Sequence, residues 1–200
     1  MNRDHVDALI KHLWPQGHDL QTPQIYALLD GARDPRIAHM VRYSGLEYAC
    51  LYTGKISPAL SQAAPYIVHL APKSAFTRTL LEQGWGESWG IFVEARADVS
   101  LEQLRRHFKN LQLVRDEDGN KLVFRFYDPR VLRIYLPTCT LSELSEFFGP
   151  TSKLLLESDG RTALLEHRKI VQGMDSRIWK IEHVAQMPVP VYDEFQALTE

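Results

Sequence analysis

Residues 24–30, with the sequence QIYALLD, constrain the fold of this chain more than any other stretch. Alternate side chains of an extended chain point to opposite faces, and in this segment both faces are apolar. A strand of this kind belongs inside a sheet, where both of its faces are covered. We therefore expect a β-sheet with residues 24–30 as a central strand.

Further apolar runs predict strands over residues 46–52, 65–70 and 90–96, and helix signals alternate with these runs. The first helix is predicted by apolar residues at helical spacing in MNRDHVDALIKHLW, the first 14 residues. Later helix starts are predicted by residues suited to an N-cap, two of which also begin a capping box: Asp34, Ser100, Asp128 and Thr140. This order of elements predicts an α+β fold with a mixed β-sheet and flanking helices.

The character of the sequence changes after Pro150. Residues 153–157 and 162–171 predict a hairpin around the turn sequence SDGR. A proline-rich tail follows, with Tyr192 and Phe195 near its end. We therefore divide the chain into an α/β N-terminal lobe, residues 1–137, and a smaller C-terminal lobe, residues 138–200.

Composition excludes several classes of protein. With 200 residues, 44% of them hydrophobic, the chain is long and apolar enough to fold around a core, and its net charge of −2 favours no nucleic-acid partner. No apolar run approaches the roughly 20 residues that span a bilayer. The first residues do not resemble a secretion signal, and Cys50 and Cys139 form no metal-binding or redox pair. We expect a cytoplasmic protein without a membrane span.

The segment VFRFYDPRVL, residues 123–132, gathers charged and aromatic residues at a predicted junction between a strand and a helix. In a strand over residues 121–127, Phe124 and Phe126 would share one face, while Arg125 and Tyr127 would share the other. Asp128 and Pro129 suit a helix start, which is the role we favour for them. The roles of Arg125 and Arg130 stay open between an internal ion pair and a recognition surface.

Catalytic motifs are missing from the sequence. The histidines form no HExxH motif, and neither a nucleophile elbow nor a P-loop is present. Asp30 and Asp128 end predicted strands, and with Arg125 they could serve a small metal- or phosphate-dependent hydrolase. Turn and cap roles explain both acids better. We therefore expect no catalytic residue, no bound metal and no cofactor, and we keep the hydrolase as the alternative.

Several motifs in fixed order give the chain a resemblance to a known family. They are YALLDGARDP (26–35), AAPYIVHL (63–70), the run from GWGESWG to YDPRVL (84–132) and FFGP (147–150). Over about residues 24–150 the sequence resembles the bacterial type VI secretion effector adaptors, the Tap or TEC chaperones. The resemblance implies a chaperone that binds a toxic effector near its N-terminus in the cytoplasm and helps load it onto the VgrG spike protein, without catalysis.

The resemblance also directs attention to particular residues. Its hallmark positions in this sequence are Asp30, Pro65, Tyr66, Arg125, Asp128, Pro129, Arg130, Gly149 and Pro150. Aromatic and arginine side chains dominate protein interfaces. We therefore take as candidate protein-binding residues Trp85, Trp89, Arg125, Tyr127 and Arg130, with the tail around Tyr192 and Phe195. For the two tryptophans, core packing is slightly favoured over binding. The last fifty residues lie outside the resemblance and could vary with the partner, and a structural piece of the secretion baseplate is a further alternative.

Overall fold

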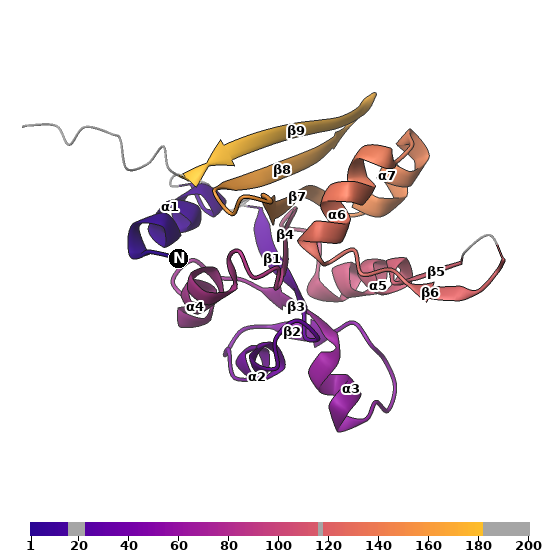
Figure 1. Cartoon of the computed structure of the whole chain (residues 1–200), viewed down its shortest axis with the longest axis horizontal. Helices are drawn as coiled ribbons and strands as arrows, with labels where there is room; N and C mark the ends of the chain where they lie inside the picture. Colours follow the sequence, from indigo (N-terminus) through magenta and orange to yellow (C-terminus); the bar gives the residue numbers. More distant parts are fainter. Residues whose placement is uncertain (16–22, 116–117, 182–200) are drawn as a thin grey trace, which may run out of the picture.

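The computed structural model describes residues 1–15, 23–115 and 118–181. Its centre is a seven-stranded sheet with the strand order β2-β3-β1-β4-β7-β8-β9 (Figure 1). These strands are β1 (Gln24–Asp30), β2 (Tyr48–Cys50), β3 (Pro65–His69), β4 (Gly90–Ala95), β7 (Thr151–Glu157), β8 (Ala163–Ile170) and β9 (Gly173–Lys180). The predicted α+β class is confirmed. Every neighbouring pair of strands is antiparallel, where a mixed sheet was expected.

Strand β1 lies inside the sheet, between β3 and β4, as its sequence predicts. Ile25, Ala27 and Leu29 belong to the hydrophobic core on one side of the sheet. Tyr26 and Leu28 belong to the core on the other side. The alternation of the strand therefore supplies apolar side chains to two separate cores, which is why this strand could be recognised from the sequence alone.

Helices cover both faces of the sheet (Figure 1). On one face the buried residues come from α1 (Arg3–Leu13), α2 (Arg36–Arg42) and α4 (Ala75–Gly84). On the other face they come from α5 (Leu101–Leu111), α6 (Pro129–Tyr135), the short 3-10 helix η1 (Leu136–Thr138) and α7 (Leu141–Phe148). The short helix α3 (Pro58–Ala63) has no buried residue and lies near β2, at the lower end of the molecule in Figure 1.

Side chains cap the helices where the sequence indicates. Ser100 and Thr140 each form a complete capping box at the start of α5 and α7. The Asp128 carboxylate accepts the backbone N–H of Arg130 at 3.0 Å in the first turn of α6. Asp34 accepts the backbone N–H of Arg36 at 2.8 Å, although α2 begins one residue later than expected, with Pro35 as its N-cap.

The strands within residues 138–181 continue the same sheet. Strand β7 pairs with β4, and β7 and β8 form the hairpin predicted around SDGR. Buried residues of α7 and β7 join the core that α5 also enters. The expected boundary between residues 137 and 138 therefore does not separate two sheets or two cores, and β8 and β9 extend from the common sheet at the top of Figure 1. Tyr192 and Phe195 lie outside the described residues.

The strand predicted over residues 121–127 is wrong in its second half. Strand β6 (Lys121–Val123) contains three residues and pairs only with β5 (Leu113–Arg115). A turn follows, in which the Asp128 N–H donates to the Arg125 carbonyl at 3.0 Å. Phe126 and Tyr127 are consecutive and both buried, so the expected alternation of faces does not hold. The turn takes precedence over the strand pattern because it leads the chain directly into the capped start of α6.

His107 links α5 to the end of α7. Its Nε2 lies 2.9 Å from the Phe147 carbonyl, and its ring packs against Gly149. A Cβ at position 149 would stand 2.3 Å from this ring, and the backbone there has a φ of +47°. Burial lowers the pKa of His107, and the hydrogen bond to Phe147 offsets part of this decrease. Burial also lowers the pKa of His69 and of His167.

We expect the free energy of unfolding to fall as the pH drops below about 6.5, where a histidine in the unfolded chain becomes protonated. The folded state keeps these three histidines neutral to a lower pH, so the unfolded state binds more protons in that window. Urea unfolding at about pH 7 and about pH 5.5 measures the effect.

His107→Gln is the matched variant for this prediction, because glutamine can still donate to the Phe147 carbonyl. The free energy of unfolding of this variant should fall less between about pH 7 and about pH 5.5 than that of the wild type, because the variant has no imidazole at position 107 to bind a proton in the unfolded chain. The comparison is needed because burial raises the pKa of Glu157, which acts in the opposite direction. An identical pH dependence in both proteins would contradict the prediction for His107.

Candidate functional site

A cluster of charged residues lies where β1 ends beside the turn before α6. We call Asp30, Arg125, Asp128 and Arg130 the junction cluster. The Asp30 side chain is only 1% exposed and forms an ion pair with Arg125, whose side chain is 43% exposed. The other Asp30 oxygen accepts the Ala32 N–H at 3.0 Å. The positive charge of Arg125 is therefore paired with a buried carboxylate of the same chain.

Asp128 and Arg130 form the second ion pair of the junction cluster. The Arg130 guanidinium donates to both carboxylate oxygens of Asp128, from Nε at 3.0 Å and from Nη2 at 2.6 Å. Burial by itself raises the pKa of Asp128, but the hydrogen bonds and the charge of Arg130 outweigh it and hold this pKa below its usual value. Asp128 is therefore a charged helix cap with an arginine fixed beside it.

Two tyrosines border the junction cluster. Burial, and then the negative charge of Asp30, raise the pKa of Tyr52 and of Tyr127. Both phenols are consequently held in their neutral form, in which they can donate hydrogen bonds but not act as bases. This arrangement favours a stable polar junction over a nucleophile.

The structure brings together the three residues named for a hydrolase. Arg125 forms an ion pair with Asp30, and the negative charge of Asp128 also contributes to raising the pKa of Arg125. Each carboxylate already accepts hydrogen bonds from an arginine and from the backbone. Across residues 1–15, 23–115 and 118–181, no group of three or more His, Cys, Asp or Glu side chains is placed to hold a metal ion. The geometry thus explains the cluster as two ion pairs.

Two of the residues proposed for protein binding are buried. This corrects the proposal for Tyr127, whereas for Trp89 it agrees with the core packing that the sequence slightly favoured. Trp89 is 3% exposed and Tyr127 is 2% exposed, and each lies in one of the two cores. The Trp89 ring also lies under Arg36, with the guanidinium carbon 5.1 Å from the ring centroid. Neither side chain can reach a partner without local unfolding.

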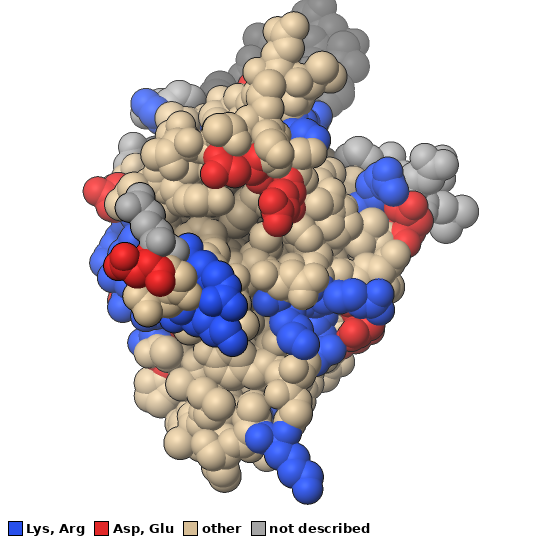
Figure 2. All heavy atoms as spheres, turned by 90° about the vertical axis from the view of Figure 1, so that its right-hand side faces the viewer, with Lys and Arg blue, Asp and Glu red and all other residues tan. Residues whose placement is uncertain are grey.

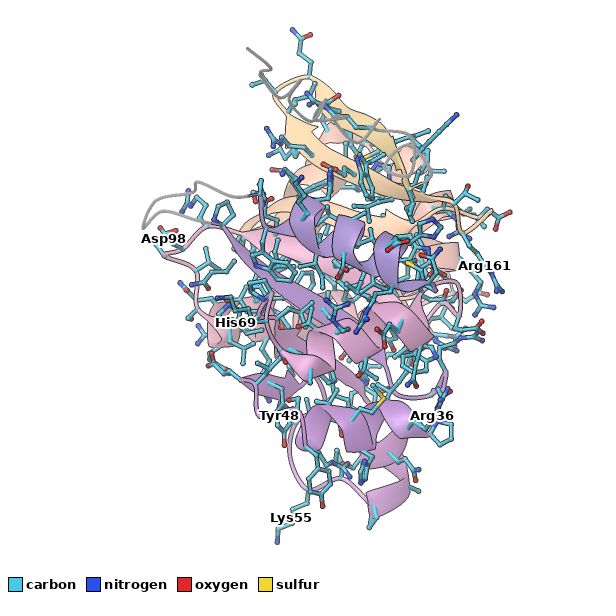
Figure 3. The ribbon with its side chains drawn as sticks, turned by 90° about the vertical axis from the view of Figure 1, so that its left-hand side faces the viewer. Arg36, Tyr48, Lys55, His69, Asp98 and Arg161 are labelled. Atoms are coloured by element: carbon cyan, nitrogen blue, oxygen red, sulfur yellow. The ribbon has the colours of Figure 1, made fainter. Side chains whose placement is uncertain are left out.

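Trp85 is partly buried and hydrogen-bonded within the chain. Its Nε1 donates to the Arg161 carbonyl at 2.8 Å, and its ring packs against the core that contains Trp89. Arg161 lies at the edge of the view in Figure 3, at the turn between β7 and β8. Trp85 therefore serves mainly to attach the tryptophan loop, residues 84–90, to this turn.

Glu157, which the sequence analysis did not single out, holds the tryptophan loop in place. This buried carboxylate at the end of β7 accepts the backbone N–H groups of Gly86 and of Ser88, the latter at 3.0 Å. Burial raises the pKa of Glu157, and these hydrogen bonds offset part of the effect. About 70 residues of sequence separate the partners, so no local pattern indicates the contact.

The hairpin of β5 and β6 presents apolar side chains that the core does not use. Leu113 is 64% exposed and Val123 is 56% exposed, and these two residues face each other across the hairpin. Val114 and Leu122 form the next pair and are exposed as well. In Figure 1 the hairpin projects from the right-hand side of the molecule. Strands with this composition normally bury one face, so the hairpin stands out as a surface for contact with another molecule.

A groove of about 340 Å³ lies along one side of this hairpin. We call it the hairpin groove, and its lining residues are Leu51, Tyr52, Thr53, Ile56, Leu60, Lys109, Gln112, Leu113 and Val123. Figure 2 faces the side from which the hairpin projects and shows a broad uncharged surface between groups of basic and acidic side chains. The sequence did not indicate this groove, because residues 121–127 were expected to form one continuous strand.

Comparison with known proteins gives one match. The model of a protein family, described as a domain of unknown function (DUF4123), matches residues 25–146, which is more than half of the chain. No curated protein and no solved structure matches significantly. The matched range begins in β1, ends within α7 and contains the whole junction cluster and the whole hairpin groove.

Proposed function

This chain belongs to the DUF4123 family, and on that premise we propose that it is a non-catalytic adaptor for type VI secretion. In this proposal the protein binds a toxic effector near the N-terminus of that effector and helps load it onto the VgrG spike. The motifs between residues 26 and 150 support the proposal through their resemblance to effector adaptors.

The observation that carries the proposal is the contrast between the polar and the apolar features of this domain. The four charged side chains of the junction cluster pair with one another, whereas the apolar side chains of the β5–β6 hairpin are exposed beside a groove. An adaptor needs a stable scaffold with an apolar surface for its client. Both requirements fit this arrangement better than they fit a reaction centre.

Cytoplasmic residence belongs to the same proposal, because an effector must meet its adaptor before it is secreted. Within the described parts of the chain, no helix is long and apolar enough to cross a membrane.

The small hydrolase stays the second candidate because Asp30, Arg125 and Asp128 do lie in one cluster. The two functions differ in what they require of Asp30. A hydrolase should lose its turnover in Asp30→Asn, whereas an adaptor that still folds should bind its client as before.

Co-expression tests the adaptor directly. We expect the full chain to co-purify with a tagged toxin that is encoded beside its own gene. Deletion of the N-terminal segment of that toxin should abolish this co-purification. Addition of the neighbouring VgrG should yield a three-protein complex on size exclusion. Failure to co-purify with any neighbouring toxin would count against the proposal, and self-assembly without a client would favour a baseplate component.

A further inference from the structure

We propose that the hairpin groove binds a peptide segment of the client that carries a carboxylate next to its apolar side chains. The identity of the client rests on the proposed function, but the chemistry of the occupant is argued from the groove alone. Three features of the groove specify this occupant: apolar walls, a buried amide that has no hydrogen-bond partner among the described residues, and a lysine.

The walls of the groove are apolar and come from two sides. Leu113 and Val123 form the wall on the hairpin, and Leu60 on α3 is a third exposed apolar residue of the lining. Leu51 is fully buried and belongs to the core next to the groove. A volume of about 340 Å³ lies at the lower end of the range of roughly 300–1,000 Å³ found for ligand sites. The space therefore suits a few aliphatic or aromatic side chains.

Gln112 adds a hydrogen-bond donor to this apolar lining. The residue is 4% exposed, and its side-chain Nε2 has no hydrogen-bond partner among the residues that the structure describes. Its backbone is fixed, because its carbonyl accepts the Phe124 N–H at 2.8 Å. A buried amide without an acceptor is costly. Because the Gln112 Nε2 is shielded from solvent, its side chain must turn toward the groove before the backbone carbonyl of a bound peptide can remove that cost. This feature favours a polypeptide over a purely apolar ligand.

Among the described residues that line the groove, Lys109 is the only charged one. It forms no ion pair within residues 1–15, 23–115 and 118–181. Lys55, on the loop that also contributes Thr53 and Ile56, points away from the body of the protein in Figure 3. Lys109 therefore places a positive charge beside the apolar lining, which favours a client segment with an Asp or Glu beside its apolar residues.

Substitutions at exposed positions test the groove without disturbing the fold. We expect Leu113→Asp and Val123→Asp each to weaken binding of a fluorescently labelled client N-terminal segment at least tenfold, since each places a carboxylate on the apolar wall. Ile178→Asp is the matched control, because Ile178 is as exposed as Leu113 but lies on β9. It should bind like the wild type, and circular dichroism should show the same fold for all four proteins.

The outcomes separate this inference from the proposed function. If Leu113→Asp and Val123→Asp bind the client segment as tightly as the wild type does, the groove is not the binding site. The adaptor role would not be affected by that result. No binding by the wild type would instead contradict the adaptor role, and the groove would then be judged with a probe that needs no client.

That probe is 8-anilinonaphthalene-1-sulfonate, an anionic aromatic dye that fluoresces in apolar sites. Its emission should rise with the wild type and with Ile178→Asp, and should fall at least fivefold with Leu113→Asp and with Lys109→Glu. Equal emission from all four proteins would overturn the inference. It would also be overturned by concentration-dependent dimerisation that Leu113→Asp abolishes, because the occupant would then be a second copy of this chain.

Discussion

Replacing Phe126 by alanine is expected to lower the free energy of unfolding by about 3–5 kcal/mol, the range typical of a buried aromatic residue. Phe126 is fully buried although it follows an exposed strand by only a few residues. Its ring lies 5.6 Å from that of Phe108 and 5.6 Å from that of Phe147, measured between centroids. These rings belong to α5 and α7, so one substitution should weaken the attachment of both helices to the sheet.

Ile134→Ala is the control for this prediction. Ile134 lies on α6, eight positions from Phe126, and its side chain is exposed. Its loss should change the free energy of unfolding by no more than about 0.5 kcal/mol. Urea titrations followed by circular dichroism measure both variants. A loss below about 1 kcal/mol in Phe126→Ala would show that the rings around it do not form a continuous core.

Features that depend on a short stretch of sequence could be predicted. Strand β1 was predicted because a run of seven consecutive residues of the sequence has apolar side chains on both faces of the strand. The caps at Ser100 and Thr140 were predicted because a capping box needs only residues three positions apart. The hairpin of β7 and β8 was predicted for the same reason, since its turn sequence lies between its strands.

Features that depend on distant partners could not be predicted. The sequence slightly favoured core packing for Trp89 but did not show what covers it: α4 and β1 pack around the tryptophan loop, and Glu157 holds that loop from the far end of β7. Tyr127 is buried because a turn replaces the strand that was expected to expose it. The role of Arg125 stayed open because its partner is Asp30, 95 positions away along the chain.

We expect Arg125→Met to lower the free energy of unfolding by about 2–3 kcal/mol. The substitution leaves the Asp30 carboxylate buried, and among the described residues the Ala32 N–H is the hydrogen-bond donor that remains to it. Removing one partner of a fully buried ion pair costs roughly 3–5 kcal/mol. We expect less here because the Arg125 side chain is 43% exposed, so water already screens part of the interaction.

The double variant Asp30→Asn with Arg125→Met gives the sharper result. It should be more stable than Arg125→Met alone by about 1 kcal/mol or more, because a neutral amide needs no counter-charge. The Ala32 N–H keeps its acceptor in the asparagine oxygen, so the turn after β1 persists. Such a rescue would identify Arg125 as the counter-ion of Asp30. If Arg125→Met kept full stability but no longer bound the client, Arg125 would instead belong to the recognition surface. The client would then contact the junction cluster as well as the apolar groove.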